Sequence, residues 1–225
     1  MCVHILKIDN SFFHEIIKAD FLLESDSLNV DENVMTRIAA VNEENDLDLF
    51  QSDIVLHKHN RHTITKRNAR RSRKFLWRDK KVPYVIAQEL INSWYKPTIM
   101  KAFEEFHKYT CVRFVPHTTE KNWLKFVKKS GCWSSVGKEY WISGAQDLSL
   151  GRGCNITATV MHELLHTLGF WHEQARADRN LYVEVMWENI REGLVEMKPT
   201  AVLFMSWVFL YFGVLELFLF FSLLD

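Results

Sequence analysis

The chain lacks net charge, because 28 lysines and arginines balance 28 aspartates and glutamates over 225 residues. Proteins that bind nucleic acid or an anionic membrane by charge usually carry a basic surplus, so we expect neither kind of partner from the overall charge. The charge is nevertheless unevenly placed, since acids dominate residues 15–53 and bases dominate residues 58–81. This polarity indicates an N-terminal segment that is separate from the domain that follows it.

A long apolar run is missing from the N-terminus. Residues 1–6 are mostly apolar, but Lys7 and Asp9 interrupt them before they reach the length of a secretory signal. We therefore expect no convincing signal peptide in this stretch. Cysteine is also scarce. The four cysteines, which allow two disulfides in three connectivities, are Cys2, Cys111, Cys132 and Cys154.

The most informative feature of the sequence is a cluster of three histidines at residues 162–172, which read His-Glu-Leu-Leu-His-Thr-Leu-Gly-Phe-Trp-His. On a helix, His162 and His166 lie one turn apart on the same face, so both imidazoles can reach one ion. Gly169 can adopt the left-handed conformation that ends a helix, and the chain can then return His172 as a third ligand. Three protein ligands and an open position are typical of a catalytic zinc site. Glu163 is placed to accept a proton from water on that ion.

The residues around the cluster resemble one family of metalloproteases. The pattern His-Glu-x-x-His-x-x-Gly-x-x-His is the metzincin signature, and Glu173 directly after it points to the astacin branch. The resemblance covers roughly residues 75–191, and on it the chain is identified as a member of the astacin family. The runs that resemble astacin landmarks, in family order, are Val82-Pro83-Tyr84, Thr110-Cys111-Val112-Arg113-Phe114, Gly131-Cys132-Trp133-Ser134, residues 148–154, residues 169–180, Tyr182-Val183 and Trp187-Glu188-Asn189-Ile190.

The resemblance implies a secreted zinc endopeptidase of the astacin type that acts on proteins or peptides. It implies one zinc per chain, bound by His162, His166 and His172, with Glu163 as the base that passes a proton to the leaving amine. The implied fold is α+β, the upper subdomain of a metzincin, with a twisted mixed sheet and two long helices. Residues 144–150 are implied to form an edge strand on which an extended substrate pairs.

The resemblance also implies a zymogen. Residues 1–60 resemble a propeptide, in which Phe50-Gln51-Ser52-Asp53 is similar to a Phe-x-Gly-Asp motif whose aspartate occupies the water position on zinc. Alternatively, Asp53 is one more acid in an acidic linker. Residues 61–74 form a basic linker in which a processing protease is expected to cleave after Arg70 or Arg73. The new N-terminus would then contact Glu173, which lies close to Gly169 in the sequence.

The disulfides are implied only in part. Cys132 and Cys154 are expected to form a bridge next to the active site. The family pairs the cysteine at the position of Cys111 with one near the end of the catalytic domain, and no cysteine follows Cys154. We therefore expect Cys111 to be a buried free thiol rather than the partner of Cys2.

Periodicity supplies the remaining elements. Strands are expected at residues 82–86, 112–115 and 123–127, one amphipathic helix at 88–107 with its aromatic residues in the core, and the active-site helix at 157–168. Asn155-Ile156-Thr157 matches a glycosylation acceptor, but Asn155 could instead cap that helix.

The resemblance stops after Ile190. The Ser-x-Met-His-Tyr turn of the family does not follow, and residues 192–225 form an unrelated apolar tail, in which 17 residues from 199 to 215 carry no charge. The lower subdomain is thus expected to be largely missing. The tail is interpreted as a gene-model error, a membrane anchor or a substitute core element. The alternative to an active protease is an inactive, truncated protein or a decoy binding module.

Overall fold

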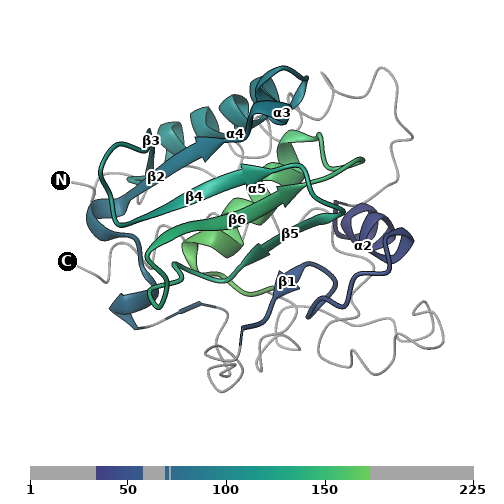
Figure 1. Cartoon of the computed structure of the whole chain (residues 1–225), viewed down its shortest axis with the longest axis horizontal. Coiled ribbons are helices and arrows are strands. Elements are labelled where there is room, and N and C mark those ends of the chain that lie inside the picture. Colours follow the sequence, from purple (N-terminus) through teal and green to yellow (C-terminus); the bar gives the residue numbers. More distant parts are fainter. Residues whose placement is uncertain (1–33, 58–68, 71, 173–225) are drawn as a thin grey trace, which may run out of the picture. The chain divides into compact units, whose positions relative to one another are not determined.

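A computed structural model of the chain describes residues 34–57, 69, 70 and 72–172 (Figure 1), all of which belong to one compact unit. Several of the features expected above lie outside these ranges: Cys2, most of the basic linker, Glu173, and the apolar tail. Among the described residues, no helix is long and apolar enough to cross a membrane. The domain boundaries expected at 60, 74 and 191 remain predictions.

A six-stranded mixed sheet forms the centre of this unit, with the strand order β1-β5-β6-β4-β2-β3 (Figure 1). Strands β2, β3, β4 and β6 run parallel to one another, and β5 pairs antiparallel with β6. The strands are β1 (Ile54–Val55), β2 (Lys81–Ile86), β3 (Arg113–Pro116), β4 (Asn122–Val127), β5 (Cys132–Ser135) and β6 (Gly144–Leu150). The α+β class expected from the sequence is therefore confirmed.

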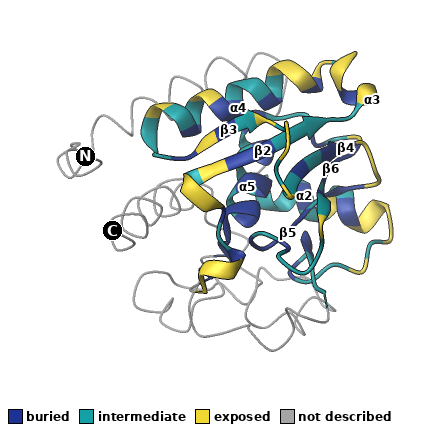
Figure 2. Cartoon of the chain, turned by 60° about the vertical axis from the view of Figure 1, so that its left-hand side comes forward, coloured by how far each residue is buried: buried dark blue, intermediate teal, exposed yellow. Residues whose placement is uncertain are grey.

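The helices are α2 (Val34–Glu44), α3 (Gln88–Ile91), α4 (Tyr95–Tyr109) and α5 (Thr157–Leu168), with short 3-10 helices at Arg73–Phe75 and Arg78–Lys80. The two long helices α4 and α5 pack against each other and lie behind the sheet (Figure 1). Their inner faces and the central strands are buried, whereas the outer faces of α3 and α4 are exposed (Figure 2). Phe103 of α4 stacks on Phe114 of β3 with ring centroids 4.4 Å apart, which joins the helix to the sheet.

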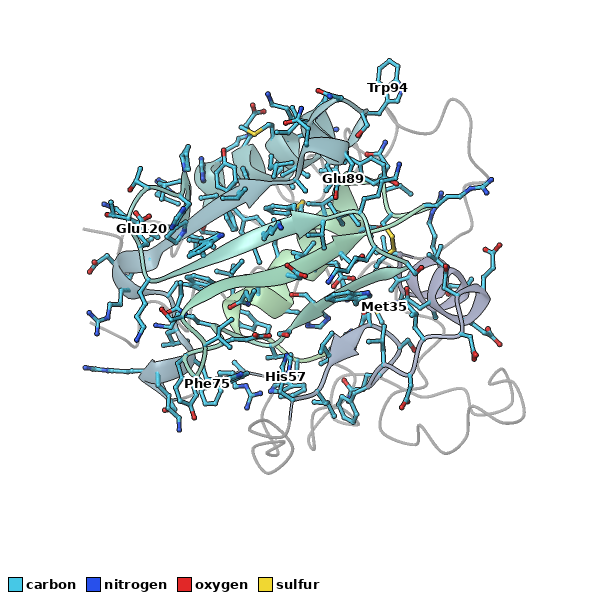
Figure 3. All side chains as sticks on the ribbon, in the orientation of Figure 1. Met35, His57, Phe75, Glu89, Trp94 and Glu120 are labelled. Atoms are coloured by element: carbon cyan, nitrogen blue, oxygen red, sulfur yellow. A yellow bond between two sulfur atoms is a disulfide. The ribbon has the colours of Figure 1, made fainter. Side chains whose placement is uncertain are left out.

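The single helix expected over residues 88–107 is wrong, because the chain forms α3 and α4 with a break between them. The Ser93 hydroxyl donates a hydrogen bond to the Leu90 carbonyl at 2.9 Å. In a continuous helix, this carbonyl would instead accept a hydrogen bond from a backbone amide of the next turn. Apolar spacing continues across the break, so periodicity could not detect it. Trp94, expected in the core, is 83% exposed and points away from the helices (Figure 3).

The expectation that residues 144–150 form an edge strand is also wrong. Strand β6 lies inside the sheet, because β4 pairs with one of its sides and β5 with the other. Strand β1, from the propeptide-like segment, then pairs parallel with β5, with Ile54 opposite Ser134. A resemblance of sequence motifs does not show which strands occupy the two hydrogen-bonding sides of β6.

Two disulfides involve described cysteines. Cys132 of β5 is bonded to Cys154, which precedes α5, with a Cα–Cα distance of 5.7 Å. Cys111 is also disulfide-bonded, and its partner lies outside the described residues. The expected free thiol is therefore wrong. The sequence analysis set the pairing with Cys2 aside because the family places the partner after Cys154, whereas a disulfide requires only proximity in space.

Candidate metal centre

Helix α5 presents two of the three histidines. It begins after Ile156, whose side chain makes no capping hydrogen bond, so the expectation that Asn155 caps the helix is wrong. The residue that ends it is Gly169, at a φ of +111°, and its amide donates to the His166 carbonyl at 2.8 Å. An L-residue rarely adopts this conformation, so a glycine is required where the chain turns back.

The chain after Gly169 returns His172 to the same point. The Nδ1 of His166 lies 2.8 Å from the Phe170 carbonyl oxygen and therefore donates to it. The Nδ1 of His172 lies 2.9 Å from Gln51 Oε1, which can accept a hydrogen bond from it. Each of these partners fixes the tautomer that leaves Nε2 as a free electron-pair donor. The sequence did not single out Gln51, because its role depends on a contact between segments 121 residues apart.

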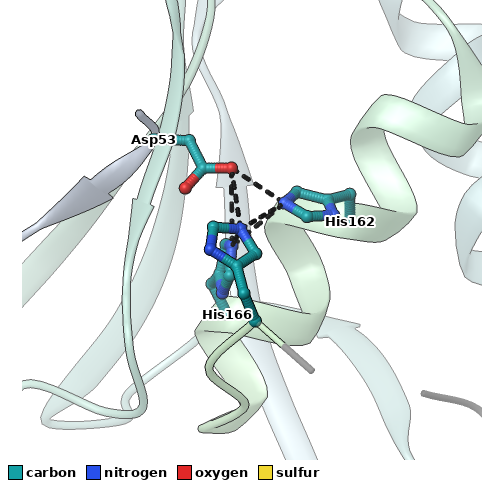
Figure 4. Close-up of side chains that lie close together, drawn as sticks. Asp53, His162 and His166 are labelled. Carbon is teal, nitrogen blue, oxygen red and sulfur yellow. Dashed lines mark hydrogen bonds and ion pairs between the residues drawn. The ribbon is translucent and has the colours of Figure 1, made fainter. Parts of the chain in front are cut away.

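The fourth group at this point is Asp53 (Figure 4). Its Oδ2 lies 2.9 Å from His162 Nε2, 3.1 Å from His172 Nε2 and 3.7 Å from His166 Nε2. The three Nε2 atoms lie 3.0 to 3.2 Å from one another. A regular tetrahedron with metal–ligand bonds of about 2.0 to 2.1 Å has edges of about 3.3 Å. The four atoms thus have the geometry of a tetrahedral zinc site.

A tight turn brings Asp53 into position. The Phe50 and Ile54 backbones exchange two hydrogen bonds of 2.9 Å around it. Ser52, which stands where the motif has glycine, has a φ of +81°, a conformation that glycine adopts at lower cost. From helix α2, the Asn42 side chain donates to the carbonyls of Ser52 and Cys132, at 2.7 Å each. Asn42 therefore ties the turn to strand β5, and no motif in the sequence had marked it.

Burial shapes the electrostatics of the site. Burial lowers the pKa of His162 to about 4, so this imidazole is neutral, as a metal ligand must be. Burial opposes ionisation of Asp53, but the neighbouring His172 and His166 outweigh it and hold the pKa of the carboxyl well below its usual range. An ionised carboxylate and a neutral imidazole are donor types that zinc binds.

Glu163 lies next to His162 on α5 and is completely buried. Neither of its carboxylate oxygens has a hydrogen-bond partner among the residues that the structure describes. Burial, and secondarily the charge of Asp53, raises the pKa of Glu163 well above its usual range. A buried carboxyl group without a partner indicates a missing water or ion, or a role in proton transfer. The residues present therefore fit a zinc ion with an adjacent general base.

The two residues expected at the processing site differ in exposure. Arg70 is 3% exposed, its amide donates to the Gly169 carbonyl at 2.8 Å, and its guanidinium lies over the rings of Phe75 and Trp171. Arg73, in the 3-10 helix that follows, is exposed. Arg70 and Arg73, which the sequence offered equally as cleavage positions, thus differ in their exposure to solvent. Glu173 lies outside the described ranges.

Comparisons with known proteins agree with this geometry. The model of the Astacin peptidase family matches residues 69–198. Meprin A subunit beta of Rattus norvegicus is 42% identical over 165 residues, which are 73% of this chain and 22% of that protein. The human subunit is 40% identical over 183 residues, 81% of this chain and 25% of that protein. The chain therefore spans about a quarter of the length of these relatives.

A solved structure is also similar. High choriolytic enzyme 1, a hatching enzyme zinc-protease from Oryzias latipes, aligns with a TM-score of 0.50 at 38% identity. The alignment covers 58% of this chain and 67% of that structure.

Proposed function

The chain belongs to the astacin family of zinc metalloendopeptidases, and from this premise we propose that it is the latent form of a zinc-dependent endopeptidase. In the proposal, residues 1–60 are a propeptide, 61–74 a processing linker and 75–191 the catalytic part. The observation that carries it is the tetrahedral arrangement of Asp53 with three histidines, one of which is followed in the chain by the buried Glu163. Asp53 takes the position that water must occupy for hydrolysis.

The histidines of the site would hold the metal, and the chemistry that zinc supplies there is Lewis acidity, which polarises a carbonyl and acidifies water. His162, His166 and His172 orient it through Nε2, because Phe170 and Gln51 engage the other nitrogens of the last two. Glu163 accepts the proton of the attacking water and delivers it to the leaving amine. Its raised pKa favours the first transfer, since a carboxylate that binds a proton more strongly is the better base toward water.

Strand β5 is the proposed platform for the substrate. Peptide ligands commonly add a strand to the exposed edge of a sheet. That edge now carries β1, with the Ser134 amide donating to the Asp53 carbonyl at 3.1 Å. Ile54 of β1 is fully buried and packs in one cluster with Val136 and Trp171. The propeptide therefore covers both the metal position and the strand edge, and its removal would free both.

Processing is proposed to follow Arg73 first, because this residue is exposed whereas Arg70 is buried. The new N-terminus would then approach Glu173. An extracellular location fits the disulfides of Cys111 and of the Cys132–Cys154 pair, which persist in oxidising compartments.

The test is peptide hydrolysis by the zinc-loaded full chain before and after limited cleavage in the linker. We expect hydrolysis only after cleavage, and loss of it in Glu163→Ala with zinc still bound. Glu89→Ala, an exposed glutamate of α3, serves as the matched control and should hydrolyse like the unchanged chain. Zinc binding without any hydrolysis after cleavage would overturn the proposal and support the alternative, an inactive binding module.

A further inference from the structure

A second acidic group lies at the end of strand β5, outside the metal centre. The side chain of Glu139 is only 9% exposed, and its Oε1 accepts a hydrogen bond from the Ser135 hydroxyl at 2.5 Å. The Nε2 of His57 lies 2.7 Å from the same oxygen. His57 follows β1 and belongs to the propeptide-like segment (Figure 3). One carboxylate of the catalytic part therefore contacts the imidazole of a residue in the propeptide-like segment.

Hydrogen bonds within the catalytic part hold the backbone at Glu139. Its amide donates to Gln146 Oε1 at 2.9 Å, and Gln146 Nε2 donates to the Gly137 carbonyl at 3.1 Å. Gln146 lies on β6 and is 2% exposed. The Gly137 amide in turn donates to the carbonyl of His166 at 2.8 Å. The backbone that carries the carboxylate is thus linked to β6 and α5, and the Ser135 hydroxyl links the carboxylate itself to β5.

An aromatic ring completes the surroundings of His57. Trp141 lies edge-on to the imidazole, with ring centroids 5.5 Å apart. The hydrogen bond to Glu139 raises the pKa of His57, so its charged form is favoured. Burial would raise the pKa of Glu139, but His57 and Ser135 outweigh it and lower the pKa. The carboxylate and the hydroxyl together make a site that suits a cation, and the indole packs beside it.

We propose that Glu139, with Ser135 and Trp141, forms a subsite for a basic side chain of the peptide substrate, which His57 fills in the latent protein. This inference rests on the proposed function, because it takes β5 as the substrate platform and residues 1–60 as a removable propeptide.

The subsite selects positive charge for a physical reason. Among the residues that the structure describes, His57 is the one ion-pair partner of Glu139. When the propeptide leaves, the Glu139 carboxylate loses the partner that lies 2.7 Å from it, and a cation is the partner that a carboxylate binds most strongly. A lysine or arginine of the substrate restores the pair, whereas an aspartate or glutamate there is repelled.

The position of the subsite along a substrate follows from the pairing of β1. Asp53 marks the metal, Val55 lies opposite Ser135, and His57 follows two residues later. At about 3.3 Å per extended residue, the preferred basic side chain should lie about two to four residues from the scissile bond. It should lie on the side of that bond that faces the C-terminal end of β5.

The deciding experiment measures peptide binding by fluorescence anisotropy, on the zinc-loaded full chain cleaved in its linker and carrying Glu163→Ala. Peptides that differ only by Lys, Gln or Glu at positions two to four residues from a central bond, on either side, are compared. We expect the Lys peptide to bind about 10- to 100-fold more tightly than the Glu peptide at one position. Glu139→Gln should remove this preference and Glu139→Lys should reverse it.

Asp147→Asn is the matched control, because it removes an acidic charge from β6 that pairs with Lys129 on the surface. It should keep the preference. Equal binding of the Lys and Glu peptides by the unchanged chain, or a preference that survives Glu139→Gln, would overturn the inference. Binding needs no turnover, so the result stands apart from the hydrolysis test: loss of hydrolysis would refute the proposed activity but not the subsite.

A second arm uses the intact, uncleaved chain and hydrogen exchange of the β1 amides. His57→Glu places two acids together, so we expect exchange at Ile54 and Val55 to quicken about 10-fold or more. His57→Lys keeps the charge and should leave exchange within about twofold of the unchanged chain. Identical exchange in both variants would show that Glu139 does not recognise charge, and would contradict the inference.

Discussion

Replacing Asp53 by alanine should partly activate the uncleaved protein. The substitution removes the oxygen that lies 2.9 to 3.7 Å from three imidazole nitrogens and leaves the other contacts of the turn in place. Removing one partner from a buried ionic group typically costs 3–5 kcal/mol. Taking about 3 kcal/mol, the population in which the metal position is open rises about a hundredfold.

Activation should nevertheless stay incomplete, because β1 still covers the strand edge. The Asp53 backbone carbonyl keeps its hydrogen bond from Ser134, and Asn42 still donates to the Ser52 carbonyl. Ile54 remains buried against Val136 and Trp171. We therefore expect the uncleaved Asp53→Ala chain to hydrolyse peptides about a hundredfold faster than the uncleaved parent, but more slowly than the cleaved parent.

The assay is the initial rate of cleavage of a quenched fluorescent peptide by zinc-loaded, uncleaved protein, with electrophoresis to confirm that the linker is intact. Asp48→Ala, an exposed acid in the same segment, is the control and should stay silent. Asp53→Ala combined with Glu163→Ala should also stay silent. A precursor as inactive as the parent, although it binds zinc and is cut normally in its linker, would refute the role of Asp53 as a latch.

Three further predictions concern the stability of the same region. Ser52→Gly should stabilise the turn by about 0.5–1 kcal/mol, measured by denaturant unfolding, because glycine relieves the positive φ; a loss of stability would contradict this. The stability lost in His57→Ala should be greatest between about pH 4.5 and 6.5. Because the pKa of His57 is raised in the folded protein, the stability from the His57 side is complete below 6.5 and is lost as pH rises through the folded pKa. Because the pKa of Glu139 is lowered, the stability from the Glu139 side is present above 4.5 and is lost as pH falls through the folded pKa. A pH-independent difference would argue against the ion pair. Replacing both Cys132 and Cys154 by serine should cost about 3 kcal/mol in the same unfolding assay, from a loop of 22 residues, and an unchanged midpoint would contradict it.

Local spacing was sufficient for the core of the site. His162 and His166 are one helical turn apart, so any helix over these residues places them together. Gly169 marks the point where that helix must end, and the structure gives it the left-handed conformation. Only two residues separate Gly169 from His172, so the turn at Gly169 keeps His172 close to the end of the helix. These features depend on fewer than a dozen neighbouring residues, and periodicity and conformational preference act over that range.

The features that the sequence did not predict depend on contacts between distant segments. Strand β6 was expected at an edge, but its neighbours β4 and β5 come from other parts of the chain. Cys111 was expected to be free because the family's usual partner does not follow Cys154, yet it is disulfide-bonded. The pairing of His57 with Glu139 joins residues on either side of the processing linker. No local pattern carries such information, since side-chain chemistry alone does not say which segments meet.

The break between α3 and α4 is a different kind of error. Leu90, Ile91 and Trp94 continue the apolar spacing of the following helix, so a periodic pattern spans a point where the backbone stops being helical. Exposure distinguishes them, because Leu90 is buried whereas Trp94 is 83% exposed. Apolar spacing is necessary for a buried helix face but does not ensure one, since tertiary packing decides which residues are covered.

The most direct test of the central claim is X-ray absorption at the zinc edge of the full, uncleaved chain, compared with Asp53→Ala. The account predicts one zinc per chain with three imidazole nitrogens and one carboxylate oxygen at about 2.0–2.1 Å. In Asp53→Ala, the histidine signature should persist while the carboxylate contribution is replaced by that of water. Three results would contradict a latent metal site closed by Asp53: absence of bound zinc, a sulfur atom among the zinc ligands, or a spectrum that Asp53→Ala leaves unchanged.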